Sequence, residues 1–141
     1  MESATELATR VAEVLEPHRE ILEGYLFGSR ARGAGHAHSD VDIAVFIDEG
    51  SAEPGLFGYQ SELTATLMSA LGTNFVDVVI LNHAPPLLYH RALRDGKRIL
   101  SRDLRATTVR EGRALSRFCD FVPQLAKIDT ALSSVDSPEE P

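Results

Sequence analysis

Residues 28–46 read Gly-Ser-Arg-Ala-Arg-Gly-Ala-Gly-His-Ala-His-Ser-Asp-Val-Asp-Ile-Ala-Val-Phe, and this stretch decides the predicted fold. It joins a turn at Gly28 and Ser29 to an alternating apolar strand that begins near Asp40. Successive strand residues point to opposite faces, so Asp40 and Asp42 are expected to share one face. The small and polar residues between turn and strand are typical of a loop.

The elements outside this stretch follow from the spacing of apolar residues. Helices are predicted over residues 4–16, 56–71, 86–94 and about 103–128, and strands over 21–27, 40–47, 74–81 and 97–100. The β-branched run 74–81 is typical of a central strand, and 97–100 of a short edge strand. We expect a single domain over 1–128, with a core at about 20–103, a C-terminal helix at about 103–128 and a flexible acidic tail at 129–141.

The composition is that of an ordinary globular protein. The chain has 141 residues, of which 43% are hydrophobic and 25% are charged. Its net charge of −7 disfavours duplex nucleic acid, which needs a basic face to neutralise phosphates. The single Cys119 cannot form an internal disulfide, and neither a signal peptide nor a membrane span is predicted. We therefore expect a cytoplasmic protein that contacts no membrane.

Three aspartates are candidate metal ligands. The Cα atoms of Asp40 and Asp42 should lie roughly 6.6 Å apart on one face, close enough for both carboxylates to reach one Mg²⁺ ion. Asp77 interrupts an apolar run, where an ionised group needs a charged partner, a metal ion or a solvent-facing position. In a three-carboxylate site, two Mg²⁺ ions about 4 Å apart could bind phosphate and activate an attacking oxygen. Asp77 would then serve as both ligand and general base.

The Gly-Ser turn is a candidate phosphate site. Gly28 allows a phosphate to approach the backbone, and Ser29 can add a hydroxyl donor. Arg30 and Arg32 can neutralise phosphate charge, although a solvated arginine is an equally ordinary role. The pattern GxxxxGK[ST] is missing, so this turn is not a Walker loop.

A zinc site is the competing interpretation of the same stretch. His36, His38 and Asp40 have the HxHxD spacing of a binuclear zinc hydrolase. That motif requires a histidine at the next position, where this chain has Val41. The residue types therefore favour Mg²⁺ over zinc.

Taken together, these residues resemble the minimal nucleotidyltransferases of the DNA polymerase β superfamily. The signature of that family is Gly-Ser, ten residues and Asp-x-Asp, which Gly28-Ser29 and Asp40-Val41-Asp42 match in full. The resemblance extends through Asp77 to residues 81–88, which are similar to the end of the MntA-type antitoxin domain. It covers roughly residues 20–103.

The resemblance implies an α+β fold, with a small mixed twisted sheet and flanking helices. It also implies triphosphate binding at Gly28 and Ser29 and Mg²⁺ ligation by Asp40, Asp42 and Asp77. Members of the MntA type transfer AMP from ATP to a tyrosine of a HEPN-domain toxin and so silence its RNase activity. Two alternatives stay open: an antitoxin that acts by binding alone, and transfer to a small molecule. A homo- or hetero-oligomer is also compatible with this resemblance.

Overall fold

The computed structural model describes residues 2–31, 33, 40–51 and 55–136. The elements in chain order are α1 (Ala4–Leu15), β1 (Ile21–Phe27), α2 (Gly28–Ala31), β2 (Val41–Ile47), η1 (Glu49–Ser51), α3 (Leu56–Leu71), β3 (Val76–Ile80), η2 (Leu81–His83), α4 (Pro86–Asp95), β4 (Lys97–Ser101) and α5 (Leu104–Asp136). Each predicted helix and strand is present, and apart from the end of α5 their bounds agree with the expected ones to within a few residues.

Helix α1 begins with a capping box. The Ser3 hydroxyl accepts a hydrogen bond from the Glu6 backbone N–H, and the Glu6 carboxylate accepts one from the Ser3 backbone N–H. This reciprocal pair satisfies backbone donors that the first helical turn leaves unpaired. Leu7, Val11 and Leu15 recur at helical spacing and are buried, so the helix presents one apolar face to the sheet.

Four strands form a single mixed sheet in the order β3-β2-β1-β4. Strand β1 is antiparallel to both β2 and β4, whereas β2 and β3 are parallel. Strand β4 lies at an edge, as predicted. The prediction that residues 74–81 form a central strand is wrong, because β3 lies at the other edge. Its β-branched residues reflect burial of one face against α3, and composition does not distinguish that from burial between two strands.

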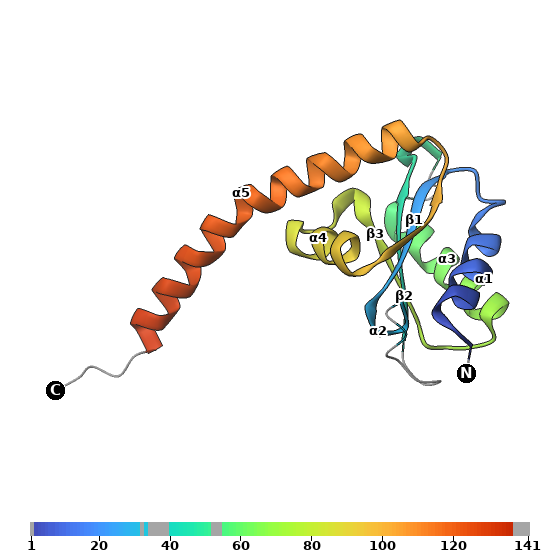
Figure 1. Ribbon diagram of the computed structural model, residues 1–141, viewed down its shortest axis with the longest axis horizontal. Helices are drawn as coiled ribbons and strands as arrows, with labels where there is room; N and C mark the ends of the chain where they lie inside the picture. The colour runs from blue at the N-terminus through green and yellow to red at the C-terminus, as the bar shows by residue number, and fades with distance from the viewer. Residues whose placement is uncertain (1, 32, 34–39, 52–54, 137–141) are drawn as a thin grey trace.

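The sheet separates two hydrophobic cores, with α1 and α3 on one face and α4 and α5 on the other (Figure 1). Strand β2 contributes to both cores. Val41, Ile43, Val45 and Ile47 pack in the core beside α1 and α3, while Ala44 and Phe46 pack with α4 and α5. This alternation matches the sequence prediction and places Asp42 on the α4 face. A small mixed sheet with flanking helices is therefore confirmed.

Helix α5 is anchored to the sheet near its start. The buried carboxylate of Glu23 on β1 accepts two hydrogen bonds from the Arg110 guanidinium, at 2.6 and 2.7 Å, and one from the Thr107 hydroxyl at 2.8 Å. The helix then runs away from the sheet as a long arm (Figure 1). It continues through Pro123 to Asp136, beyond the end near residue 128 that the sequence predicts. Residues 137–141 of the expected tail lie outside the described chain.

Within the described ranges, no helix is both long enough and apolar enough to cross a lipid bilayer.

Candidate active site

Two of the predicted ligands meet at one end of the sheet. Asp42, next to the start of β2, pairs in register with Asp77 of the parallel strand β3. On its other side Asp42 pairs with Phe27, the last residue of β1. Asp42, Asp77, Phe27 and Gly28 line a common cavity of about 480 Å³. The register of three strands thus brings together the Gly-Ser turn and two carboxylates.

Gly28 is held in close contact with Asp42. Its φ of +80° lies in the left-handed region that glycine adopts without strain. A Cβ atom at this position would overlap the Asp42 carboxylate oxygen Oδ2 and lie 3.0 Å from its Cγ. The turn therefore requires glycine for two reasons, the backbone conformation and the proximity of the carboxylate.

The surroundings of Asp42 disfavour its ionised form. Burial raises the pKa of the Asp42 carboxyl to about 6, and the negative charges of Asp77 and Asp40 add to the shift. A cation placed between these groups would relieve the repulsion and favour the ionised carboxylate. The arrangement is thus suited to a hard divalent ion, which prefers carboxylate oxygens and takes its remaining ligands from water or phosphate.

Asp40 and Asp77 are both exposed. Of the three settings considered for Asp77, the structure shows the solvent-facing one, because Val76 and Val78 on either side of it are buried and face the opposite way. Asp40 precedes β2 and does not line the cavity. Among the described residues, no three acidic, histidine or cysteine side chains are grouped closely enough to form a ready metal cage.

The predicted phosphate-binding residues are only partly gathered. Ser29 lies in the short helix α2 directly after Gly28 and is half-buried. Arg30 lines a different cavity, with Val41 and Leu71 on the α1 side of the sheet. Arg32, His36 and His38 lie outside the described residues. Of the three predicted phosphate ligands among the described residues, only Gly28 lines the cavity with Asp42 and Asp77.

Helix α4 supplies residues that the sequence prediction missed. Leu88, Arg91 and Asp95 complete the cavity wall opposite the sheet. Arg91 is exposed and forms no hydrogen bond or ion pair with the described residues, so its positive charge is available to an anion. The spacing of three and four residues places all three side chains on one helix face. That spacing is visible in the sequence, but only the packed structure shows that this face meets the carboxylates.

This cavity combines groups suited to a metal-bound phosphate ester. Asp42 and Asp77 can coordinate a divalent ion, Gly28 allows close approach of a ligand, and Arg91 can contact an anionic oxygen. Such an arrangement can position a phosphorus atom for attack by a hydroxyl group and stabilise a departing anion.

Comparisons with known proteins agree with this chemistry. Residues 9–105 match the family model described as polymerase beta, nucleotidyltransferase. The protein adenylyltransferase MntA of Aphanizomenon flos-aquae (strain 2012/KM1/D3) is 40% identical over 79 residues, which make up 51% of this chain and 51% of that protein. The match thus spans about half the length of that relative.

Solved structures share the fold. A crystal structure of a toxin-antitoxin with AMP-PNP is 26% identical, with a TM-score of 0.73 over 89% of this chain and 98% of that one. A crystal structure of the toxin-antitoxin MntA-HepT is 23% identical, with a TM-score of 0.66 over 89% of this chain and 96% of that one, and it shows the fold alone. Since the family model covers more than half of the sequence, this chain belongs to the polymerase beta nucleotidyltransferase family.

Proposed function

We propose that this protein transfers AMP from ATP to a partner protein and thereby acts as an antitoxin. The observation that carries the proposal is the pairing of Asp42 with Asp77 beside Gly28. The relative at 40% identity is a protein adenylyltransferase, and the similar toxin-antitoxin structure contains the ATP analogue AMP-PNP. The resemblance to MntA-type antitoxins identifies the partner as a HEPN-domain toxin and the acceptor as one of its tyrosines.

Each residue of the site has a separate proposed role in AMP transfer. Asp42 and Asp77, joined by Asp40, are the proposed ligands of two Mg²⁺ ions, which would polarise the α-phosphate and neutralise the leaving pyrophosphate. Gly28 and Ser29 would face the triphosphate, with Arg30 and Arg32 as further contacts. The acceptor oxygen forms a bond to the α-phosphorus while the bond from that phosphorus to pyrophosphate breaks. Asp77, exposed beside Asp42, is the proposed acceptor of the hydroxyl proton.

Arg91 adds a role that no motif predicted. Arg91 lines the same cavity as Asp42 and Asp77. It is therefore placed to bind a phosphate oxygen through a charge-assisted hydrogen bond.

The test uses the full chain, ATP labelled at the α-phosphate, Mg²⁺ and a HEPN-domain protein as the candidate partner. We expect label on a tyrosine of that protein, loss of labelling with EDTA, and loss with Asp42→Asn. Asp120→Asn is the matched control, because Asp120 is an exposed carboxylate on α5 and does not line the cavity.

Two results would overturn the proposal. One is an unmodified partner after incubation with wild-type protein that binds ATP. The other is equal protection of cells by wild type and by Asp40→Ala/Asp42→Ala, which would show that binding alone silences the toxin. Labelling of an aminoglycoside-type small molecule in place of the protein would identify the third function considered above.

A further inference from the structure

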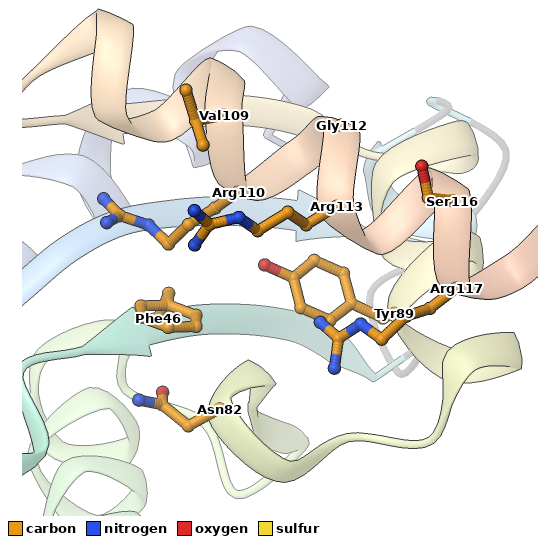
Figure 2. A pocket seen from close by; sticks show the side chains of 9 residues that line it. All are labelled: Phe46, Asn82, Tyr89, Val109, Arg110, Gly112, Arg113, Ser116 and Arg117. Carbon is orange, nitrogen blue, oxygen red and sulfur yellow. The ribbon is translucent and has the colours of Figure 1, made fainter.

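A second cavity lies on the same face of the sheet, at the far end of β2. It has a volume of about 880 Å³, is open to solvent and is lined by residues of β2, η2, α4 and α5 (Figure 2). Phe46, which forms part of its wall, follows Asp42 by four residues on the same strand face, a separation of roughly 13 Å at the usual strand rise. The two cavities share no lining residue.

Helix α5 gives this cavity an arginine-rich wall. Arg110, Arg113 and Arg117 are spaced three and four residues apart, so they lie on one helix face. The charge of Arg110 is neutralised by its bidentate pair with buried Glu23. Arg113 and Arg117 are exposed and form no ion pair within the described part of the chain. In a protein of net charge −7, two uncompensated guanidiniums at one cavity indicate an anionic ligand.

Tyr89 provides a second, independent indication of a ligand. Tyr89 as a whole is only 2% exposed, and its hydroxyl is buried without a hydrogen-bond partner among the described residues. Figure 2 shows the phenol among the residues that line the cavity, with its hydroxyl on the side of Arg113 and directed away from the Arg117 guanidinium. A buried hydroxyl left unpaired destabilises the fold, and a ligand that accepts its hydrogen bond removes that cost. Burial also raises the pKa of Tyr89 to about 12, so the group stays protonated and can donate.

The other side chains that line the cavity are aromatic or have their hydrogen bonds made within the protein. The Phe46 ring lies 4.9 Å from the Arg110 guanidinium carbon, and the Tyr89 ring lies 5.8 Å from that of Arg117. The Asn82 amide donates to the Ile47 carbonyl and accepts from the Ile47 N–H, so it is not available to a ligand. The free polar groups are therefore mainly donors, set among flat apolar surfaces.

These features favour a phosphate over a carboxylate. Arg113, Arg117 and Tyr89 line one cavity, and phosphate offers three peripheral oxygens to accept from their donors. The volume exceeds what one phosphate fills, and it lies in the range of sites for small organic ligands. The Arg110 guanidinium covers one face of the Phe46 ring, so a base would meet Phe46 at the ring edge and the adjoining guanidinium plane.

We propose that this cavity is a second nucleotide site, separate from the carboxylate cavity. It takes the phosphate of a nucleoside phosphate on Arg113, Arg117 and the Tyr89 hydroxyl, with the base against Phe46. The inference stands independently of AMP transfer, because none of these residues lines the carboxylate cavity.

The test is calorimetric titration of the full chain with AMP, ATP and inorganic phosphate, all in EDTA so that no divalent ion supports binding at the carboxylates. We expect one AMP per chain, with phosphate binding more weakly than AMP. Arg113→Gln and Arg117→Gln should each lower AMP affinity at least about tenfold. Arg105→Gln is the matched control on the same helix, because Arg105 is exposed and does not line the cavity.

Tyr89→Phe separates ligand binding from folding. The substitution should weaken AMP binding severalfold and leave the nucleotide-free protein as stable as wild type or more stable, because it removes an unpaired buried hydroxyl. A purely structural role for this hydroxyl would give the opposite result, a less stable protein with unchanged affinity.

Four outcomes would overturn the proposal. The first is failure of wild type to bind either AMP or ATP in EDTA, and the second is equal affinity in wild type and the Arg113 and Arg117 variants. The third is loss of AMP binding in Asp42→Asn, which would place the nucleotide at the carboxylates. The fourth is displacement of AMP by an acidic peptide at lower concentration than by ATP, which would make the cavity a protein-docking surface. Labelling of the partner, tested separately, does not bear on any of these outcomes.

Discussion

At the scale of single residues, the contact between Gly28 and Asp42 ties the turn to the carboxylate site. Gly28→Ala combines backbone strain at positive φ with overlap of the Asp42 carboxylate. We expect destabilisation of about 1–3 kcal/mol and loss of at least about tenfold in AMP transfer. Both are measured, the first by urea unfolding and the second by labelling of the partner.

Gly33→Ala is the control for this substitution. Gly33 has a similar φ of +72°, but a Cβ atom there would meet nothing within 4 Å. It shares the backbone strain and lacks the collision, so its transfer activity should stay near that of wild type. Equal loss of activity in both variants would show that strain alone, and not the contact with Asp42, disables the site.

The raised pKa of Asp42 makes stability depend on pH. Between about pH 4 and pH 6 the folded chain retains a proton on Asp42 that the unfolded chain has released, so rising pH favours unfolding in this window. Asp42→Asn removes this penalty. We expect the variant to be more stable than wild type at pH 8, with a smaller difference at pH 4, measured by urea unfolding without divalent ions.

Asp120→Asn serves as the comparison for this stability test as well. That carboxylate is exposed on α5, and its removal should change stability little at either pH. A variant Asp42→Asn that is less stable than wild type at pH 8 would contradict the repulsion among the three aspartates.

At the scale of elements, the pair of Glu23 and Arg110 fastens α5 to β1. Arg110→Leu leaves a fully buried carboxylate without its cation, which should cost about 3–5 kcal/mol of unfolding free energy. Arg98→Leu breaks the more exposed pair with Glu111 and should cost about 0–1 kcal/mol. Denaturant titration of both variants measures the difference.

The double variant Glu23→Leu/Arg110→Leu distinguishes charge from packing. Replacing both members removes the uncompensated charge, so most of the lost stability should return. If the double variant is no more stable than Arg110→Leu, the pair stabilises the fold through the packing of its side chains and not through charge balance.

The sequence predicts the positions of helices and strands better than it predicts which of them pack or pair with each other. Helix and strand positions follow from apolar spacing, and strand alternation predicts that Asp42, Ala44 and Phe46 share one face of β2. Asp40 precedes β2, so its place on that face stays a prediction. The position of Asp77 opposite Asp42 depends on the parallel pairing of β2 with β3, and no local pattern specifies that pairing. The same limit explains why β3 was predicted in the centre of the sheet.

Long-range packing sets the remaining limit on the site prediction. Arg91 joins the carboxylates only because α4 folds across the sheet, and Arg30 turns to the opposite side of it. Nothing in the local sequence around Arg30 and Arg91 distinguishes the two arginines. Their different placement arises from contacts between segments far apart in the chain.

At the scale of the whole molecule, α5 forms an arm that leaves the body (Figure 1). Its first part is held by Thr107, Arg110 and buried Ala114. We expect a chain that ends at Pro123 to keep its unfolding free energy within about 0.5 kcal/mol of wild type, because the removed residues extend beyond this anchor. Chemical denaturation monitored by circular dichroism checks the value, and a loss above about 2 kcal/mol would show that the arm packs against the body in solution.

The edge position of β3 affects the order in which parts of the protein unfold on heating. Within the described strands, β3 is hydrogen-bonded to β2 alone, so it can open locally while the rest of the sheet stays formed. Such an opening separates Asp77 from Asp42 without exposing the two cores in full. Inactivation should therefore precede global melting, and amide protons of β3 should exchange with solvent sooner than those of β1. The thermal persistence of the carboxylate site is therefore set by the local stability of β3 and not by the average stability of the fold.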